Sequence, residues 1–324
     1  MRWSVVGSSV AGTTHIAKQI GCDDAFAYAL VDDDVVVAAV ADGAGSYSGT
    51  SALGAFVACQ TIAAAATEEG FGRRFKVSDS ARLVALVREL FTDAFTAIEK
   101  AAASQKLNIK ALSTTLSIAI VSPSLSAFAQ LGDGVVVVSD TESMSCLIPE
   151  PKGEYANETN FLTSKKAIAE NLRIQLVSGV TAFALSTDGL RYKILELSSG
   201  EPYMPFFDAI WSQLESRTVP GSSLSRFLSG LLDDQTGDDK TLVAGCLSTV
   251  LDSGDQSIMS GSQPPLELRV GQPTAVLDFI SGPFNERLGE SSDQDLNVLV
   301  DGSGNSDYST NDPDSVGLEY RGLA

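Results

Sequence analysis

Hydrophobic and polar positions follow two different periods along the first 250 residues. Apolar residues recur at steps of three and four over residues 80–104, which predicts an amphipathic helix with Ser78 or Asp79 at its start. An alanine-rich stretch from Ser46 to about Thr67 predicts a second helix. The apolar stripe of the first helix indicates core packing. Its members are Leu83, Leu86, Val87, Leu90, Phe91, Ala94, Phe95 and Ile98.

Short apolar runs bounded by turn residues predict strands around these helices. Two runs flank Asp32-Asp33-Asp34, which is typical of a hairpin. The predicted strands cover residues 24–31, 35–41, 112–121, 125–132, 135–140, 180–185 and 241–247, and two further helices are predicted at 206–217 and 222–232. A polar loop is expected over residues 150–166. The order is therefore a hairpin, two helices, a run of strands, two helices and a final strand.

The pattern changes after about Leu251. Residues 252–324 contain 13 acidic and 3 basic residues, a net charge of −10, which is more than half of the −19 of the whole chain. We expect a main domain over residues 1–250 and an acidic, largely flexible tail over residues 251–324. Two strand-like pieces at 266–270 and 275–280 predict that part of this tail contacts the main domain or a partner.

Charge and cysteine usage exclude several classes of protein. A net charge of −19 and an isoelectric point near 4.3 repel nucleic acid and anionic lipid, so we expect neither as a partner. The chain lacks an apolar run of about 18 residues, so we expect no membrane span. Its first residues lack a long apolar stretch, so we also expect no signal peptide. Four scattered cysteines without a C-x-x-C pair indicate reduced thiols in the cytoplasm. The single histidine, His15, excludes a multi-histidine zinc site.

Aspartates stand where predicted strands begin or end. They are Asp23, Asp24, Asp42, Asp133, Asp188, Asp238 and Asp239, and Asp42, Asp133 and Asp188 each precede a glycine. Carboxylates brought together repel one another unless a cation neutralises them. Their oxygen atoms select Mg²⁺ or Mn²⁺ over zinc. Two such ions about 4 Å apart can hold a hydroxide and clamp a phosphoryl group for in-line displacement.

Each aspartate also has a purely structural interpretation when taken alone. Asp133-Gly134 suits a type I′ hairpin turn. Asp42 and Asp188 could cap the helical turns that follow them. Asp238-Asp239 could be a loop signal beside Gly237. The set as a whole, in this order, favours the metal site.

Six short motifs in this order resemble the type 2C metal-dependent protein phosphatases, and most closely their divergent bacterial branch. The resemblance covers roughly residues 4–248. The motifs are Gly12-Thr13-Thr14-His15 with Cys22-Asp23-Asp24-Ala25, Val40-Ala41-Asp42-Gly43-Ala44-Gly45, Ser113-Thr114-Thr115-Leu116, Gly132-Asp133-Gly134, Ser186-Thr187-Asp188-Gly189 and Gly237-Asp238-Asp239-Lys240-Thr241.

The resemblance implies a four-layer α-β-β-α sandwich of two antiparallel sheets flanked by helices. It implies a metal-dependent phosphatase that hydrolyses phosphoserine or phosphothreonine in a phosphoprotein substrate, such as a kinase-regulated signalling protein, with Mn²⁺ or Mg²⁺. It also implies ligands: Asp42 to two ions, the Gly43 carbonyl to one of them, Asp188 and Asp238 to the other, Asp23 or Asp24 on the metal side, and Asp133 with Asp188 for a third ion.

Two departures from the family pattern concern the binding of the substrate phosphate. Residues 16–20 contain no arginine, and Ala44 stands where many members have a histidine. His15 and Lys18 are the candidates to bind phosphate, and His15 to protonate the leaving group, although His15 also suits a structural hydrogen bond. The departures leave open a catalytically silent phosphoprotein-binding module. An N-terminal nucleophile hydrolase using Thr13 is a third alternative.

Overall fold

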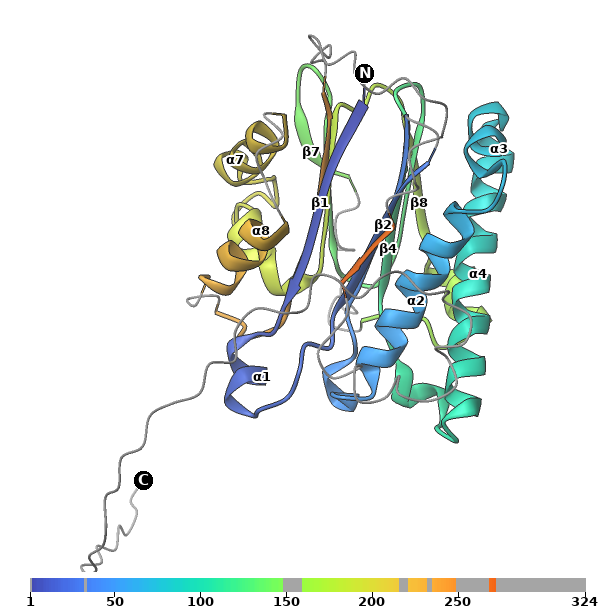
Figure 1. Cartoon of the computed structure of the whole chain (residues 1–324), viewed down its shortest axis with the longest axis vertical. Helices are drawn as coiled ribbons and strands as arrows, with labels where there is room; N and C mark the ends of the chain where they lie inside the picture. Colours follow the sequence, from blue (N-terminus) through green and yellow to red (C-terminus); the bar gives the residue numbers. More distant parts are fainter. Residues whose placement is uncertain are drawn as a thin grey trace, which may run out of the picture. The chain divides into compact units, whose positions relative to one another are not determined.

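A computed structural model describes residues 2–31, 34–147, 159–215, 221–231, 235–248 and 268–271. In this part, two antiparallel sheets stack face to face, and helices cover the outer face of each (Figure 1). The four-layer sandwich predicted from the sequence is therefore confirmed. No helix within these ranges is long and apolar enough to cross a membrane.

The first sheet has the spatial order β1-β10-β9-β6-β7, with antiparallel pairing throughout. Its strands are β1 (Arg2–Val10), β10 (Lys240–Ser248), β9 (Ala182–Ser186), β6 (Val135–Ser139) and β7 (Met144–Cys146). At one edge of this sheet, the first strand of the chain therefore pairs with a strand that lies more than 200 residues later in the sequence. Helices α7 (Met204–Glu215) and α8 (Gly221–Ser229) cover its outer face.

The second sheet has the spatial order β11-β2-β3-β4-β5-β8. Its strands are β2 (Ala25–Val31), β3 (Val35–Ala41), β4 (Leu116–Val121), β5 (Ser126–Leu131), β8 (Arg173–Val177) and β11 (Leu268–Gly271). Every residue of β3 is buried, because one face packs on the first sheet and the other on helices. This burial explains why β3 appears in the sequence as a continuous apolar run rather than as an alternation.

The helices on the second sheet include the two predicted from the sequence. Helix α4 spans Ser80–Ser104, and the side chain of Asp79 caps it by accepting a hydrogen bond from the Arg82 amide at 2.9 Å. The alanine-rich stretch divides into a 3₁₀ turn at Gly45–Tyr47 and helix α2 at Ser51–Ala66. The other helical elements are α1 (Thr13–Ala17), α3 (Phe71–Val77), α5 (Lys165–Asn171), α6 (Arg191–Ile194) and 3₁₀ turns at Ile109–Leu112 and Asp188–Leu190.

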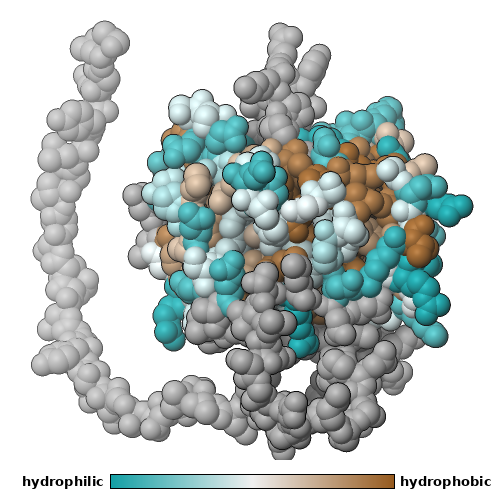
Figure 2. Space-filling view, turned by 90° about the horizontal axis from the view of Figure 1, so that it is seen from above, coloured by the Kyte–Doolittle hydropathy of each residue, from teal (hydrophilic) through white to brown (hydrophobic). Residues whose placement is uncertain are grey.

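Part of the predicted tail joins the second sheet. The strand-like piece at 266–270 corresponds to β11, which pairs antiparallel with β2. The piece at 275–280 and most of the polar loop at 150–166 lie outside the described residues. The division between a domain and a tail at residue 250 stays a prediction. Figure 2 shows hydrophilic residues over much of one end of the molecule, with hydrophobic residues gathered between them.

Candidate metal centre

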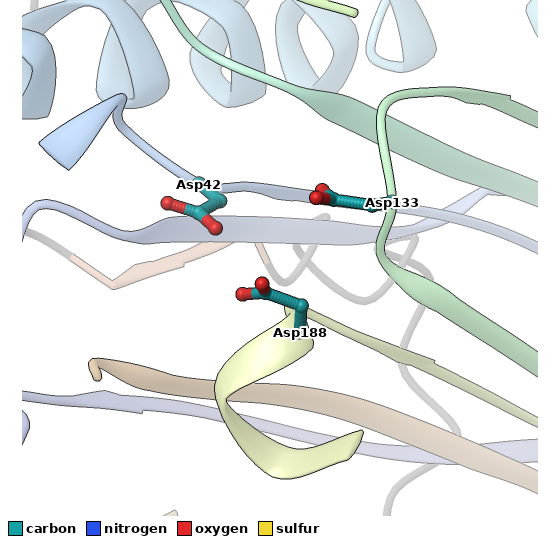
Figure 3. A group of neighbouring side chains, drawn as sticks. All are labelled: Asp42, Asp133 and Asp188. Carbon is teal, nitrogen blue, oxygen red and sulfur yellow. The ribbon is translucent and has the colours of Figure 1, made fainter. Parts of the chain in front are cut away.

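Three aspartates from three separate strand ends converge at one end of the sandwich. Asp42 follows β3, Asp133 joins β5 to β6, and Asp188 begins the 3₁₀ turn after β9. One carboxylate oxygen of each lies within 4.8 Å of those of the other two. The carboxylates of Asp42 and Asp188 face each other, and that of Asp133 points toward them (Figure 3). The predicted meeting of Asp42 and Asp188 is thus observed.

Hydrogen bonds to a neighbouring loop fix the backbone of Asp42. The Thr115 amide donates to the Asp42 carbonyl at 2.9 Å, and the Asp42 amide donates to Thr115 Oγ1 at 3.0 Å. Gly43 continues this pairing through an isolated bridge to Thr114. The motif at residues 113–115 therefore holds the end of β3 in place. The cap of the following 3₁₀ turn is Ala44, so Asp42 is not an N-terminal cap.

The loop that carries Asp133 crosses from one sheet to the other. Strands β5 and β6 belong to different sheets, so Asp133-Gly134 is not a hairpin turn and that interpretation is wrong. Gly132 has a φ of +121°, which a residue with a side chain rarely adopts. Two arginine side chains hold the loop. Arg191 Nη2 donates a hydrogen bond to the Asp133 carbonyl at 2.5 Å, and Arg173 Nη2 donates one to the Gly132 carbonyl at 2.5 Å. The sequence interpretation missed both arginines.

Burial and mutual repulsion disfavour charge on the carboxylates of Asp42 and Asp188. Burial, followed by the charges of Asp24 and Asp188, raises the pKa of Asp42 well above its usual value. Burial, followed by the charges of Asp133 and Asp238, raises the pKa of Asp188 to about 6, and Arg191 partly offsets this rise. Asp188 Oδ1 is buried and has no hydrogen-bond donor among the described residues. A set of crowded carboxylate oxygens, one of which lacks a hydrogen-bond donor in the described structure, fits a divalent cation of the Mg²⁺ or Mn²⁺ type.

Asp24 lies beside this cluster and is 1% exposed. Its Oδ2 accepts hydrogen bonds from Thr187 Oγ1 at 2.7 Å and Thr241 Oγ1 at 2.8 Å. Burial and then the charge of Asp239 raise its pKa, and the two hydroxyl groups oppose this rise. The charge of Asp24 also raises the pKa of Asp42.

Asp238 and Asp239 are adjacent in sequence but differ in their surroundings. Asp238 is exposed, and its charge raises the pKa of both Asp42 and Asp188, so it lies near the cluster without being one of its three members. Asp239 is 2% exposed and accepts hydrogen bonds from the amides of Gly12 at 2.7 Å and Asp23 at 2.5 Å. Asp239 therefore anchors the segment that leads into β2, a role that sequence reasoning missed.

His15 is part of the same anchor. Its Nδ1 lies 2.9 Å from Asp239 Oδ1, and its Nε2 lies 4.0 Å from Asp23 Oδ2 and 3.5 Å from Ser48 Oγ. The side chain is buried, which favours the structural interpretation of this residue. Lys18, in contrast, is exposed at the end of α1.

The positions of Asp188 and Thr13 bear on two further interpretations made from the sequence. Thr187 precedes the 3₁₀ turn as its cap residue, and Asp188 is the first residue within the turn, so Asp188 is not an N-terminal cap either. Thr13 begins α1 after the nine-residue strand β1, which pairs along its whole length with β10. Cleavage before Thr13 would detach a paired strand of the first sheet, which disfavours the N-terminal nucleophile alternative.

Comparisons with known proteins identify the family and the fold. The family described as Protein phosphatase 2C matches residues 11–229. Serine/threonine-protein phosphatase 3 of Escherichia coli is 29% identical over 255 residues, which cover 75% of this chain and 97% of that protein. Two solved structures share the fold at 13% identity over 76% of this chain: a bacterial serine phosphatase (TM-score 0.53, 99% of that chain) and a serine/threonine phosphatase of Staphylococcus aureus (TM-score 0.52, 96% of that chain).

Proposed function

Because the chain belongs to the protein phosphatase 2C family, we propose that Asp42, Asp133 and Asp188 form the core of its divalent-cation site. The chain is a metal-dependent protein serine/threonine phosphatase, and its substrates are phosphoproteins. The observation that carries the assignment of the site is the convergence of three carboxylates within 4.8 Å. Such crowding is unfavourable without a compensating positive charge.

The ligand set that we propose extends beyond these three residues. Asp24 and Asp238 belong to it because their charges already act on Asp42. The Gly43 carbonyl belongs to it because Gly43 continues directly from Asp42. We propose two Mn²⁺ or Mg²⁺ ions, with Asp133 and Asp188 providing for a third.

Divalent cations in a site of this kind lower the pKa of water and polarise phosphoryl oxygens. The protein itself keeps the carboxylates of Asp42 and Asp188 turned toward each other and partly shields them from solvent. Arg191 stabilises the ionised form of Asp188 and, through the Asp133 carbonyl, fixes the third carboxylate. This preorganisation means that little rearrangement is needed when a phosphoryl group arrives.

The roles of His15 and Lys18 in substrate binding stay proposals. The ammonium group of Lys18 is exposed and can reach a phosphate in solution, so we propose it as a phosphate-binding group. His15 is held against Asp239, so we propose that it positions the segment carrying Asp23 and Asp24. Protonation of the leaving group by His15 would require it to leave this contact.

The decisive test is the Asp42→Asn variant. It removes one charge from the centre of the cluster while keeping the size of the side chain. We expect at least a 100-fold loss of Mn²⁺-dependent hydrolysis of p-nitrophenyl phosphate and of phosphothreonine peptides. Asp208→Asn, an exposed position on α7, is the matched control and should keep full activity.

Two outcomes would contradict this assignment. An Asp42→Asn variant as fast as the wild type would show that the cluster is not the reaction centre. A wild-type protein that binds Mn²⁺ and phosphopeptide without turnover would support the silent binding module instead.

A further inference from the structure

An apolar groove lies on the outer side of the first sheet, away from the aspartate cluster. It has a volume of about 320 Å³ and lies between α7, α8 and β1. Figure 1 shows both helices on this side of the sheet. The side chains of Phe227 and Tyr203 are 46% and 44% exposed, and the rings of Phe227 and Phe206 lie 5.9 Å apart. The lining includes Val6, Tyr203, Phe206, Ile210, Leu224 and Phe227. Exposed apolar surface of this kind commonly marks a docking site.

The last described strand, β11, contacts β1, the strand that contributes Val6 to this groove. Gly271, at the end of β11, pairs with Phe26 of β2, and a Cβ atom at Gly7 of β1 would meet the ring of Phe26. Gly7 therefore faces the interior between the sheets. Val6, its neighbour in β1, points to the opposite face and lines the groove. Strand β1 is an edge strand of the first sheet, and β11 is an edge strand of the second sheet. The chain that follows β11 therefore has to pass around the edge formed by β1 to reach the groove.

The chain that follows contains a suitable occupant. Gly271 is followed by 53 residues, in which residues 275–280 read Ala-Val-Leu-Asp-Phe-Ile between Pro273 and Pro283. Residues 272–280 can extend over about 30 Å. The path from β11 to the groove crosses the spacing between the two stacked sheets, about 10 Å, and the similar spacing between the first sheet and its covering helices. The extended segment is longer than this path. The segment is thus apolar, near and long enough.

We propose that residues 275–280 of this chain dock in the groove between α7, α8 and β1. Docking buries the aromatic walls of the groove together with the apolar residues of the segment, so both partners gain from leaving water. The short connection to β11 keeps the segment at a high effective concentration, which favours this occupant over a separate molecule. The inference does not depend on the identity of the metal ligands.

Disulfide trapping tests the proposal in the full-length chain. Ala209→Cys places a thiol on the exposed wall of the groove, and Val276→Cys places one in the segment, in a Cys146→Ser background because the other three native thiols are buried. We expect an intramolecular disulfide. Adding Leu277→Ser and Phe279→Ser should slow its formation at least tenfold, because these changes keep the tether length and remove only the apolar contacts. Val298→Ser with Leu299→Ser, also apolar positions of the tail, is the matched control and should leave the rate unchanged.

Hydrogen exchange on the chain without engineered cysteines gives a second readout. We expect Leu277→Ser with Phe279→Ser to speed exchange of the α8 amides, while p-nitrophenyl phosphate hydrolysis stays at the wild-type rate and shows that the domain is folded. Trapping rates or α8 exchange that are insensitive to Leu277 and Phe279 would overturn the proposal. Disulfide-linked dimers whose yield rises with protein concentration would assign the groove to a second copy and overturn it equally.

Discussion

Asp188 combines burial, like-charged neighbours and an unsatisfied oxygen in one side chain. Its Oδ1 is buried without a donor in the described part of the chain, and its pKa is raised to about 6. An isolated carboxylate would relieve this situation by taking up a proton. A bound divalent cation relieves it at neutral pH, so proton and metal are expected to compete for the same atoms.

This competition predicts an unusual pH dependence of stability in the metal-free protein. The folded-state pKa of Asp188 lies above its ordinary value of 3.8, so its contribution to stability is complete below about pH 4 and is lost as the pH rises through 6. The total loss is on the order of 3 kcal/mol, about half of it between pH 5 and pH 7. Urea denaturation in EDTA should therefore give a lower free energy of unfolding at pH 7 than at pH 5.

Asp188→Asn should weaken this dependence, whereas Asp208→Asn should leave it unchanged. Mn²⁺ at pH 7 should restore the stability of the wild type but not that of Asp188→Asn. A free energy of unfolding that rises from pH 5 to pH 7 in EDTA would contradict the burial of charge at this site.

Asp238 and Asp239 should separate metal binding from folding. Asp239→Ala leaves the buried amides of Gly12 and Asp23 without their acceptor, which should lower the free energy of unfolding by about 3 kcal/mol even without metal. Asp238→Ala removes an exposed charge that repels Asp42 and Asp188. We expect it to weaken Mn²⁺ binding and to leave metal-free stability nearly unchanged.

Urea denaturation in EDTA and Mn²⁺ titration calorimetry on both variants measure the two effects. Equal losses of metal-free stability in the two variants would contradict the distinction between an anchoring and a ligating aspartate.

At the scale of elements, a local sequence signal marks the start of α4. The carboxylate of Asp79 accepts the Arg82 amide at the start of α4, a 25-residue helix whose apolar stripe fills the outer core of the second sheet. Asp79→Ala should lower the free energy of unfolding by about 1 kcal/mol, and Asp79→Asn should cost less because asparagine also caps. Thermal unfolding with Mn²⁺ present measures this difference. An alanine variant as stable as the wild type would show that tertiary packing alone fixes the start of α4.

At the scale of the whole molecule, β11 connects a distant part of the chain to the second sheet, whose strand β3 ends just before Asp42. It lies at the edge of the second sheet, and its backbone pairs with residues 26–29 of β2. Removing it exposes the edge of β2, whose next neighbour in the sheet, β3, leads into Asp42.

Two truncations measure this contribution. We expect a chain of residues 1–248 to unfold several degrees below one of residues 1–272, equivalent to roughly 1–2 kcal/mol, because only the longer chain keeps β11 and both chains lack residues 275–280. The activity of both should be compared at saturating Mn²⁺. Equal melting temperatures would contradict a structural role for β11 and the expectation that the tail contacts the main domain.

Features set by neighbours in the sequence were predictable. The period of residues 80–104 specified α4, the apolar runs beside Asp32-Asp33-Asp34 specified β2 and β3, and the glycines after aspartates marked the loops of the site. The missed elements are short or partly exposed, so their local patterns are weak: β1, α1, α3, β7, α5, β8 and α6.

The sequence by itself determined the type of most elements and which carboxylates are available, because both depend on residue types only a few positions apart. Only the tertiary structure decided which carboxylates meet. It brought Asp133 to Asp42 and Asp188 by sending β5 and β6 to different sheets, and it buried Asp239 while leaving Asp238 exposed. These outcomes depend on contacts between residues far apart in the chain, and such contacts leave no periodic signal along the sequence.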